Sequence, residues 1–118
     1  MAINKSSEFE HRKIRLAQLS KALGHPARLA ILELVKDDSI CNCGDIAKKL
    51  PLAQSTISQH IKILKDANLI EGKVKGIKIC YEISTESLNE LKINLGDFIK
   101  VLNEKRVNNS DIKTQKCL

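Results

Sequence analysis

Residues 50–65, LPLAQSTISQHIKILK, read as a turn followed by an amphipathic helix, and this stretch decides the fold. Pro51 cannot continue a preceding helix and biases Leu50 away from helical geometry. We expect either Gln54 or Ser55 to cap the new helix. Apolar residues then recur at spacings of four and three, which places them on one helix face: Ile57, Ile61 and Leu64.

The opposite face of this helix carries hydrogen-bonding groups and positive charge but no carboxylate: Thr56, Ser58, Gln59, His60, Lys62 and Lys65. The major groove of DNA suits such a face, because it offers base-edge donors and acceptors between rows of phosphates. We therefore expect these residues, with Gln54 and Ser55, to contact DNA. Taken alone, the pattern also fits an ordinary helix with a solvated polar face.

Composition fits one small domain with an anionic partner. Of 118 residues, 42% are hydrophobic but only 3% are aromatic, so the core must be aliphatic, which suits packed helices. Twenty Lys and Arg against fourteen Asp and Glu give a net charge of +6, which favours an anionic partner without identifying it. The few aromatic residues argue against a stacking platform for single-stranded nucleic acid.

The sequence shows no membrane segment and no signal peptide. No apolar run approaches the roughly 20 residues that span a bilayer, and the N-terminus, MAINKSSEFEHRK, has no apolar run. We therefore expect a cytoplasmic protein. Its four cysteines would then be reduced thiols that are available as ligands.

Helices are expected upstream of the opening stretch. A first helix over 9–23 ends at Gly24, and His25 and Pro26 open a second helix that ends near 37–38. A β-prone segment, 39–41, and a short third helix, 43–50, follow. Two polar residues form a capping-box-like start for this third helix: Asn42 and Asp45.

The amphipathic helix that is expected to contact DNA, the recognition helix, spans residues 55–67 and ends at Asn68. A basic hairpin is expected to follow it. Residues 69–83 change to the alternating period of strands, and Gly76 supplies the turn. Two strands alone are only marginally stable, so the hairpin must pack on the helices. Its lysines are further expected DNA contacts: Lys73, Lys75 and Lys78.

The last expected helix, 86–105, begins at a Ser84 or Thr85 cap and is more apolar than a peripheral helix needs. We expect a homodimer interface that it shares with the first helix, because DNA readers of this kind commonly use two half-sites. The alternative is that this helix folds back on its own core. Its apolar positions are Leu88, Leu91, Leu95, Phe98, Ile99 and Leu102.

This order of elements predicts a mainly α protein with a small β-hairpin, a winged helix-turn-helix domain over residues 8–105. Residues 1–7 are expected to be disordered and residues 106–118 to form a flexible tail.

Three stretches resemble the ArsR/SmtB family of bacterial metal-sensing repressors: LSKALGHPARLAILELV, ICNCGDIAKKL and QSTISQHIKILKDANLIEGKVKGIKICYEIS. The resemblance covers about residues 19–84. It implies a homodimeric winged-helix repressor that binds double-stranded operator DNA and releases it when an effector binds. Cys41 and Cys43 resemble the Cys-X-Cys pair of the arsenical-resistance repressors, which implies trivalent arsenic or antimony as inducer. No cofactor is then required for DNA binding itself.

The residues fit such a site at a helix entrance. Because residues two apart lie on opposite sides of a regular helix, Cys41 and Cys43 could chelate one ion only where the chain is extended or unwound. Exposed N–H groups at a helix start lower the pKa of a thiol, and soft thiolates suit soft ions. The alternative is two small buried side chains, although the intervening Asn42 is polar.

A third sulfur ligand is left open. In the family pair an acidic residue directly follows the second cysteine, whereas here Gly44 intervenes, and Ala47 stands near the place of a third cysteine in some members. Cys117 could supply the third thiolate, as could Cys80 or a small molecule, although Cys80 is expected to be structural. The family's zinc site on the last helix is not expected, because that helix contains no His.

Other functions remain as alternatives. On the same fold, Cys41 and Cys43 could form a thiol redox or persulfide switch, or sense another soft metal. A winged-helix protein-interaction module is a further alternative, against which the lysine-bearing hairpin argues. We expect no enzyme, because the sequence shows no convincing Gly-rich phosphate loop, no nucleophile–base–acid pattern and no zincin motif.

Overall fold

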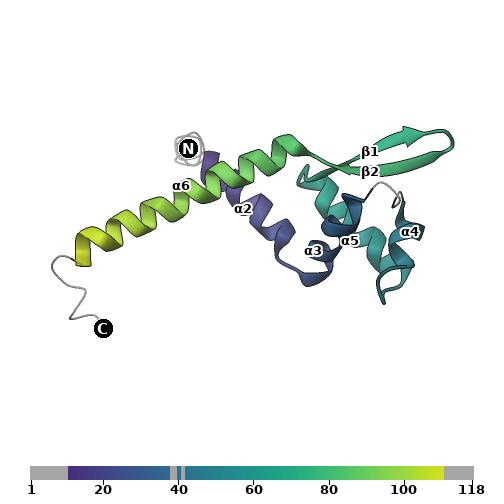
Figure 1. Ribbon diagram of the computed structural model, residues 1–118, viewed down its shortest axis with the longest axis horizontal. Coiled ribbons are helices and arrows are strands. Elements are labelled where there is room, and N and C mark those ends of the chain that lie inside the picture. The colour runs from purple at the N-terminus through teal and green to yellow at the C-terminus, as the bar shows by residue number, and fades with distance from the viewer. Residues whose placement is uncertain (1–10, 38–39, 41, 111–118) are drawn as a thin grey trace, which may run out of the picture.

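The computed structural model describes residues 11–37, 40 and 42–110, and the side chains among them as far as residue 104. The elements are α2 (His11–Leu23), α3 (Pro26–Val35), α4 (Cys43–Ala47), α5 (Gln54–Asp66), β1 (Ile70–Lys75), β2 (Lys78–Ile83) and α6 (Thr85–Ser110). As Figure 1 shows, the helices of the N-terminal half gather beneath a two-stranded antiparallel hairpin, and α6 runs away from it. This arrangement confirms the predicted winged helix-turn-helix, with α5 as recognition helix and β1–β2 as the wing.

The core is aliphatic, as composition requires, and lies between the N-terminal helices and the base of the wing. Its fully buried side chains come from four helices and the turn before β1: Leu19, Ile31, Ile46, Ile57, Leu64 and Leu69. The predicted apolar face of α5 is confirmed, because Ile57 and Leu64 are fully buried and Ile61 is only 2% exposed. Burial of this face fixes which side of α5 remains available to a ligand.

The helix starts were predicted with mixed success. The capping box of α4 is confirmed: Asn42 Oδ1 accepts from the Asp45 N–H at 3.0 Å, and Asp45 Oδ2 accepts from the Asn42 N–H at 3.2 Å. The predicted cap of α5 is wrong, because Ala53 occupies the N-cap position and no side chain caps the helix. This leaves the first N–H groups of α5 without a side-chain partner from the cap residue.

The end of α5 is a Schellman motif, which confirms Asn68 as the stop. Asn68 adopts the left-handed conformation, with φ of +62°, which Asn tolerates better than most residues. Its N–H donates to the Lys65 carbonyl at 2.8 Å, and the Leu69 N–H donates to the Leu64 carbonyl at 3.0 Å. Leu69 is thereby brought back onto the core, and the chain turns directly into β1.

The wing is a short antiparallel ribbon whose register runs from Ile70 opposite Ile83 to Lys75 opposite Lys78. Gly76 closes it with φ of +65°, as the expected glycine turn requires. Only its base is buried: Ile70 is 2% exposed, whereas Val74 is 79% exposed and Ile77 is fully exposed. The outer half of the wing therefore projects from the domain.

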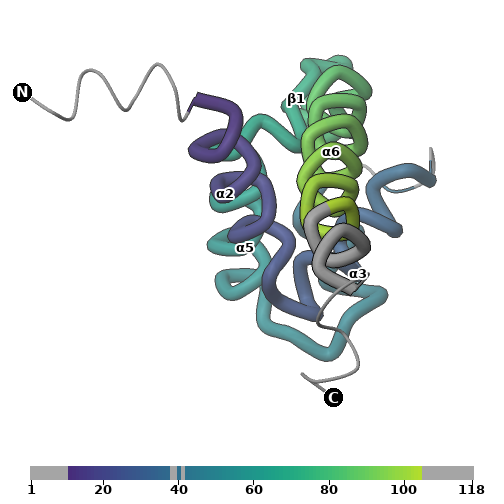
Figure 2. Tube along the Cα trace, turned by 90° about the vertical axis from the view of Figure 1, so that its left-hand side faces the viewer, coloured from purple at the N-terminus to yellow at the C-terminus, as the bar shows by residue number. Residues whose placement is uncertain are grey.

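Helix α6 is longer than predicted, because it continues past Lys105 to Ser110. Ser84 caps it, as expected, by accepting the Ser87 N–H at 3.2 Å. Its first half packs across α2, and its second half stands clear of the other elements (Figures 1 and 2). Large apolar side chains along it are between 38% and 59% exposed: Leu88, Ile93, Leu95, Phe98, Ile99, Val101 and Leu102. None of the described helices is long and apolar enough to cross a bilayer.

Several expectations fall outside the described residues. They concern the N-terminal segment 1–7, most of the β-prone segment 39–41, and the two cysteines Cys41 and Cys117.

Candidate nucleic-acid interface and thiol site

Helix α5 turns its polar face to solvent. Thr56 and His60 are half-buried, and the other residues predicted on this face are exposed: Gln54, Ser55, Ser58, Gln59, Lys62 and Lys65. One carboxylate lies beside this face, because the Lys62 ammonium is 3.2 Å from Asp66 Oδ2, one turn further along. The structure thus places all the predicted residues of α5 on one accessible helix, and their contacts with DNA remain a prediction.

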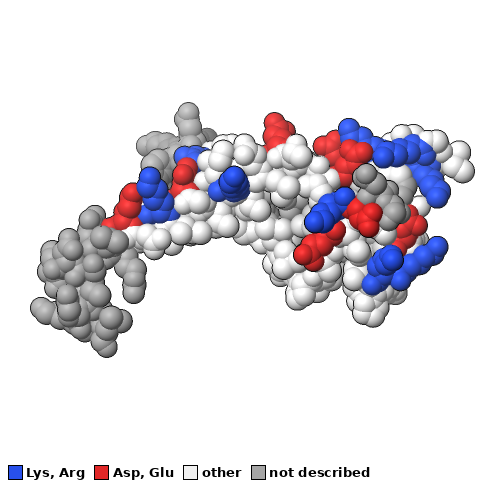
Figure 3. Space-filling model, in the orientation of Figure 1, with Lys and Arg blue, Asp and Glu red and all other residues white. Residues whose placement is uncertain are grey.

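The wing lysines share one face of the hairpin with two carboxylates. Lys73 Nζ lies 3.5 Å from Glu71 Oε1, and Lys75 Nζ lies 3.7 Å from Glu82 Oε2. Exposed pairs of this kind are worth about 0–1 kcal/mol, so a phosphate could replace either carboxylate. Lys78, at the tip, makes no ion pair with any described residue. Figure 3 shows the resulting pattern, in which positive charge follows the wing and the acidic residues lie near its base.

His60 is held by Arg28, a residue whose role the sequence left open. Arg28 Nη1 lies 3.1 Å from His60 Nδ1, and Arg28 Nε and Nη2 donate to the carbonyls of Ala22 and Lys21. Because a guanidinium only donates, His60 Nδ1 must accept, which leaves Nε2 as the protonated ring nitrogen. Arg28 is therefore engaged within the domain, and His60 has only Nε2–H to offer to DNA.

The surroundings of His60 also favour its neutral form. Its ring lies 4.6 Å from the ring of His25, centroid to centroid, at an interplanar angle of 53°. Burial lowers the pKa of His60 below its ordinary value of 6.5, and the neighbouring His25 and Arg28 lower that pKa further. His60 is thus a neutral hydrogen-bond donor at neutral pH.

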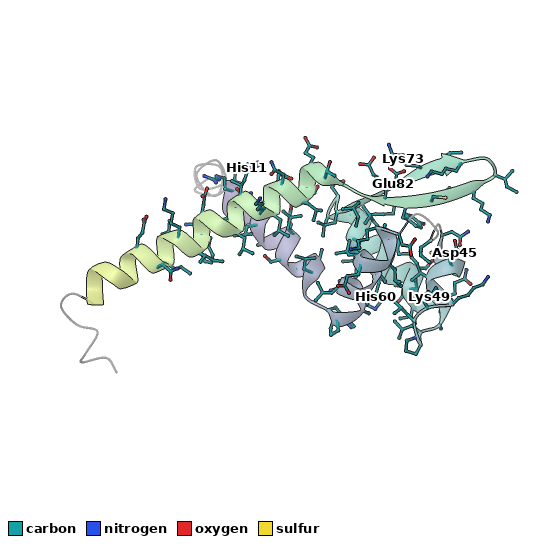
Figure 4. The ribbon with its side chains drawn as sticks, in the orientation of Figure 1. His11, Asp45, Lys49, His60, Lys73 and Glu82 are labelled. Atoms are coloured by element: carbon teal, nitrogen blue, oxygen red, sulfur yellow. The ribbon has the colours of Figure 1, made fainter. Side chains whose placement is uncertain are left out.

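Two further exposed lysines were not among the DNA contacts predicted from the sequence. Lys48 and Lys49 follow α4 directly and are exposed. Figure 4 places Lys49 near the edge of the domain on which His60 lies, whereas Lys73 and Glu82 lie on the wing above. The signal in the sequence was the pair of adjacent lysines just before the Pro51 turn.

The Cys43 thiol lies at the start of α4 and contacts the recognition helix. Cys43 is the first residue of α4, is half-buried and is a free thiol. Its Sγ is 3.6 Å from Ser58 Oγ on the recognition helix. Burial raises the pKa of Tyr81 on β2, and the electrostatic interaction with Cys43 adds to the rise. The sulfur thus joins the start of α4 to α5.

Cys80 differs from expectation, because it is disulfide-bonded rather than a reduced thiol. It is 8% exposed on β2, and the cysteine that it joins lies outside the described residues. Within the described part of the chain, no group of three His, Cys, Asp or Glu side chains could hold a metal ion. A thiolate site built on Cys43 therefore needs Cys41, Cys117 or an external ligand.

Comparison with known proteins gives a consistent result. The model of the bacterial regulatory protein arsR family matches residues 25–72, from the cap of α3 to the start of the wing. The chain is 34% identical over 80 residues to the arsenical resistance operon repressor of Staphylococcus xylosus. The aligned residues cover 68% of this chain and 76% of the relative.

Solved structures show the same architecture. An ArsR-like transcriptional regulator from Rhodococcus sp. RHA1 superposes with a TM-score of 0.74, covering 86% of this chain and 94% of the other, at 22% identity. The cadmium metal-sensor CMTR of Mycobacterium tuberculosis superposes with a TM-score of 0.53 at 30% identity, covering 74% of this chain and 86% of the sensor. The first of these similarities concerns the fold alone.

Proposed function

The chain belongs to the ArsR family of bacterial regulatory proteins, which are helix-turn-helix transcription regulators, and on that premise we propose how this member is regulated. We propose a cytoplasmic, homodimeric repressor that binds double-stranded operator DNA through α5 and the wing. Binding of trivalent arsenic or antimony by Cys41 and Cys43 would release the repressor from the operator.

The observation that carries this proposal is the contact between Cys43 Sγ and Ser58 Oγ, at 3.6 Å. A soft ion that binds the Cys43 thiolate must draw its sulfur toward a second sulfur. Because Ser58 is on the exposed face of the recognition helix, that movement acts directly on the helix that would contact bases. The coupling between inducer and operator would then need no long relay.

The backbone between the two cysteines supports chelation. Asn42 is extended, with φ of −126° and ψ of −176°. In extended backbone, side chains two residues apart project to the same side, whereas inside a helix they diverge. The capping box that involves Asn42 and Asp45 holds this conformation at the entrance of α4. Asn42 thus has the extended conformation that a Cys-X-Cys chelate at a helix entrance would need of its middle residue.

The identity of the inducer rests on the relatives and on sulfur chemistry. The relative from Staphylococcus xylosus is named an arsenical resistance operon repressor, and a structural relative is titled a cadmium metal-sensor. We place arsenic and antimony first because a Cys-X-Cys pair with one further sulfur suits a three-coordinate ion. In the reduced protein Cys117 or a small thiol would supply that third sulfur, because Cys80 is buried on β2.

Dimerisation is supported by the apolar seam of α6. Leu88, Leu91, Leu95, Phe98 and Leu102 follow alternating spacings of three and four, the pattern of a helix-pairing seam. Four of these five side chains are exposed by at least 38%. A second copy of the chain would cover them and would place two recognition helices on two half-sites.

A second candidate function is a thiol redox switch, and the disulfide at Cys80 favours it. Oxidation or reduction of a bond that involves β2 would alter the wing without any metal. In this case the effector would be an oxidant, and arsenite would have no effect on operator affinity.

One titration separates the two candidates. Reduced protein is bound to a labelled duplex from the promoter of its own gene, and fluorescence anisotropy is followed as arsenite, antimonite, cadmium, zinc or diamide is added. The metalloid proposal expects release by arsenite and antimonite that Cys41→Ser or Cys43→Ser abolishes. Release by diamide alone would overturn it in favour of the redox switch.

A further inference from the structure

We propose that Arg28 is a positioning residue for base recognition: it holds the His60 ring so that only Nε2–H is presented to the major groove, where it donates to N7 of a purine. Arg28 thereby sets the base preference of the recognition helix at one position of each half-site without touching DNA itself. This inference rests on the part of the proposed function that concerns operator binding, and does not depend on the inducer.

The Arg28 guanidinium is fixed by two bonds besides the one to His60. Its Nε donates to the Ala22 carbonyl at 2.7 Å, and its Nη2 donates to the Lys21 carbonyl at 3.3 Å. Both carbonyls belong to the last turn of α2, which is the negative end of the helix dipole. Because the guanidinium is a rigid planar fork, these two bonds determine where its third nitrogen, Nη1, lies.

Nη1 of Arg28 meets the Nδ1 edge of the His60 ring at 3.1 Å. The two nitrogens of an imidazole point in nearly opposite directions, so a ring whose Nδ1 accepts from Arg28 directs Nε2–H away from α3. His60 is half-buried and lies between the exposed Gln59 and the buried Ile61 in sequence. The edge that carries Nε2 is therefore the part of the ring that remains available to a ligand.

A second residue restrains the face of the His60 ring. The His25 ring lies 4.6 Å away, centroid to centroid, at an angle of 53°. His25 is itself held in place, because its Nδ1 accepts the Ala27 N–H at 3.0 Å and so caps α3. Arg28 thus holds one edge of the His60 ring while His25 lies against the ring, and both come from the start of α3.

A donor that is held in this way distinguishes between bases. Guanine and adenine present the acceptor N7 at the edge of the major groove, whereas cytosine presents a donating amine there. A ring that can only donate at Nε2 favours a purine and opposes cytosine, which would bring two donors together. The exposed Lys62 and Lys65 of the same helix suit phosphates better than a neutral imidazole does, which favours a base edge for His60.

Base analogues test the contact. Each purine of a labelled duplex from the promoter of the gene is replaced in turn by its 7-deaza analogue, which lacks the N7 acceptor. We expect the affinity of the wild type to fall about two- to tenfold at one purine of each half-site, which corresponds to one hydrogen bond. His60→Ala should bind the natural duplex more weakly and be insensitive to that replacement. The absence of any purine whose N7 matters in a His60-dependent way would overturn the proposal.

A double-mutant cycle tests the role of Arg28. Arg28→Met should weaken binding to the natural duplex and reduce the effect of the N7 replacement, but have no further effect in the His60→Ala background. Arg28→Lys keeps the charge and loses the planar fork, so it should behave like Arg28→Met. Full affinity of Arg28→Lys, or equal losses in both backgrounds, would overturn the proposal, because Arg28 would then act on a phosphate or on the fold. Circular dichroism and thermal unfolding confirm that each variant is folded.

NMR of the protein without DNA tests the geometry by itself. Proton–nitrogen correlation spectra should show His60 of the wild type as one neutral tautomer with Nε2 protonated, whereas Arg28→Met should show protonation of Nδ1 as well. A protonated Nδ1 in the wild type would overturn the proposal.

The outcomes also separate this proposal from the proposed function. If the wild type binds DNA but does not respond to arsenite, only the proposed inducer fails, and the cycle still decides the role of Arg28. If the wild type does not bind the promoter duplex, operator binding and the reading of a purine fail together. The NMR spectra then still decide whether Arg28 fixes the ring.

Discussion

The Arg15 guanidinium donates a hydrogen bond of 3.0 Å to the carbonyl oxygen of Ala67, the residue that closes the recognition helix. The same guanidinium contacts Glu90 Oε1 at 2.9 Å and Ser87 Oγ at 3.1 Å, both on α6. Ser87 Oγ in turn donates to the Asn68 carbonyl at 2.6 Å. The end of α5 is thereby fixed to α2 and to the helix that carries the proposed dimer seam.

Arg15→Met should destabilise the protein, because it removes the side-chain donor to the Ala67 carbonyl and one of the hydrogen bonds of the buried Ser87. The Arg15 side chain is only 15% exposed, so we expect a loss of about 1–3 kcal/mol in the free energy of unfolding. Urea denaturation at fixed protein concentration measures it. Arg12→Met is the matched control, because the Arg12–Asp97 pair has side chains that are 63% and 58% exposed and should contribute less than about 1 kcal/mol. Equal losses would contradict the role given to Arg15.

His60 should make stability depend on pH in one direction. The pKa of His60 is lowered in the folded state, mainly by burial, so below pH 6.5 the unfolded chain takes up a proton that the folded chain does not. The His60 contribution is constant above pH 6.5, falls as pH drops below that value, and levels off once folded His60 is protonated too.

Two measurements check this pH dependence. Urea denaturation at pH 7.5 and pH 5.5 should show a larger loss of stability for the wild type than for His60→Gln. The imidazole of His60, followed by NMR, should titrate below 6.5 in the folded protein. Titration at or above 6.5 would show that Arg28 does not hold the ring in the neutral form.

Phe98→Asp should dissociate the proposed dimer, because it places a charge in the apolar seam of α6. Phe98 is 44% exposed in a single chain, so its loss should have little effect on the monomer fold. Sedimentation velocity over a range of concentrations gives the association constant. Lys100→Asp places the same side chain on another face of α6 and should leave the dimer intact. If the wild type itself sediments as a monomer, the homodimer is wrong.

Lys78→Ala should weaken DNA binding in a salt-dependent way. Lys78 lies at the wing tip and forms no ion pair with a described residue, so its charge is available to a phosphate. Loss of one phosphate contact should lower the slope of log K against log salt concentration by about 0.9. Anisotropy titrations at several salt concentrations measure this slope. Lys36→Ala, at the opposite end of α3 from His25, is the control that should not change it.

What the sequence could predict was local. The apolar spacing of Ile57, Ile61 and Leu64 determined which face of α5 is buried, and Asn42 with Asp45 formed the expected capping box. Asn68 and Gly76 adopt the left-handed conformations that their positions in a helix stop and a hairpin turn require. Each of these features depends on residues a few positions apart, where periodicity and turn chemistry are decisive.

What the sequence could not predict depends on contacts between distant elements. The Arg28–His60 contact joins residues 32 positions apart, and the Arg15–Glu90 contact joins residues 75 positions apart. Neither is encoded in a local pattern, since each arises from the packing of α2 and α3 against later helices. The same holds for the contact between Cys43 Sγ and Ser58 Oγ, which joins residues 15 positions apart. The α5 cap was predicted wrongly because Gln54 is already helical.

The central claim is that arsenite at the Cys43 site and operator DNA oppose each other through α5. The most direct test is the affinity of the reduced protein for arsenite, measured by calorimetry with and without a saturating promoter duplex. The account predicts weaker arsenite binding on DNA, by the same factor by which arsenite weakens operator binding, with Cys43→Ser abolishing both effects. Equal arsenite affinities in the free and DNA-bound protein would contradict it.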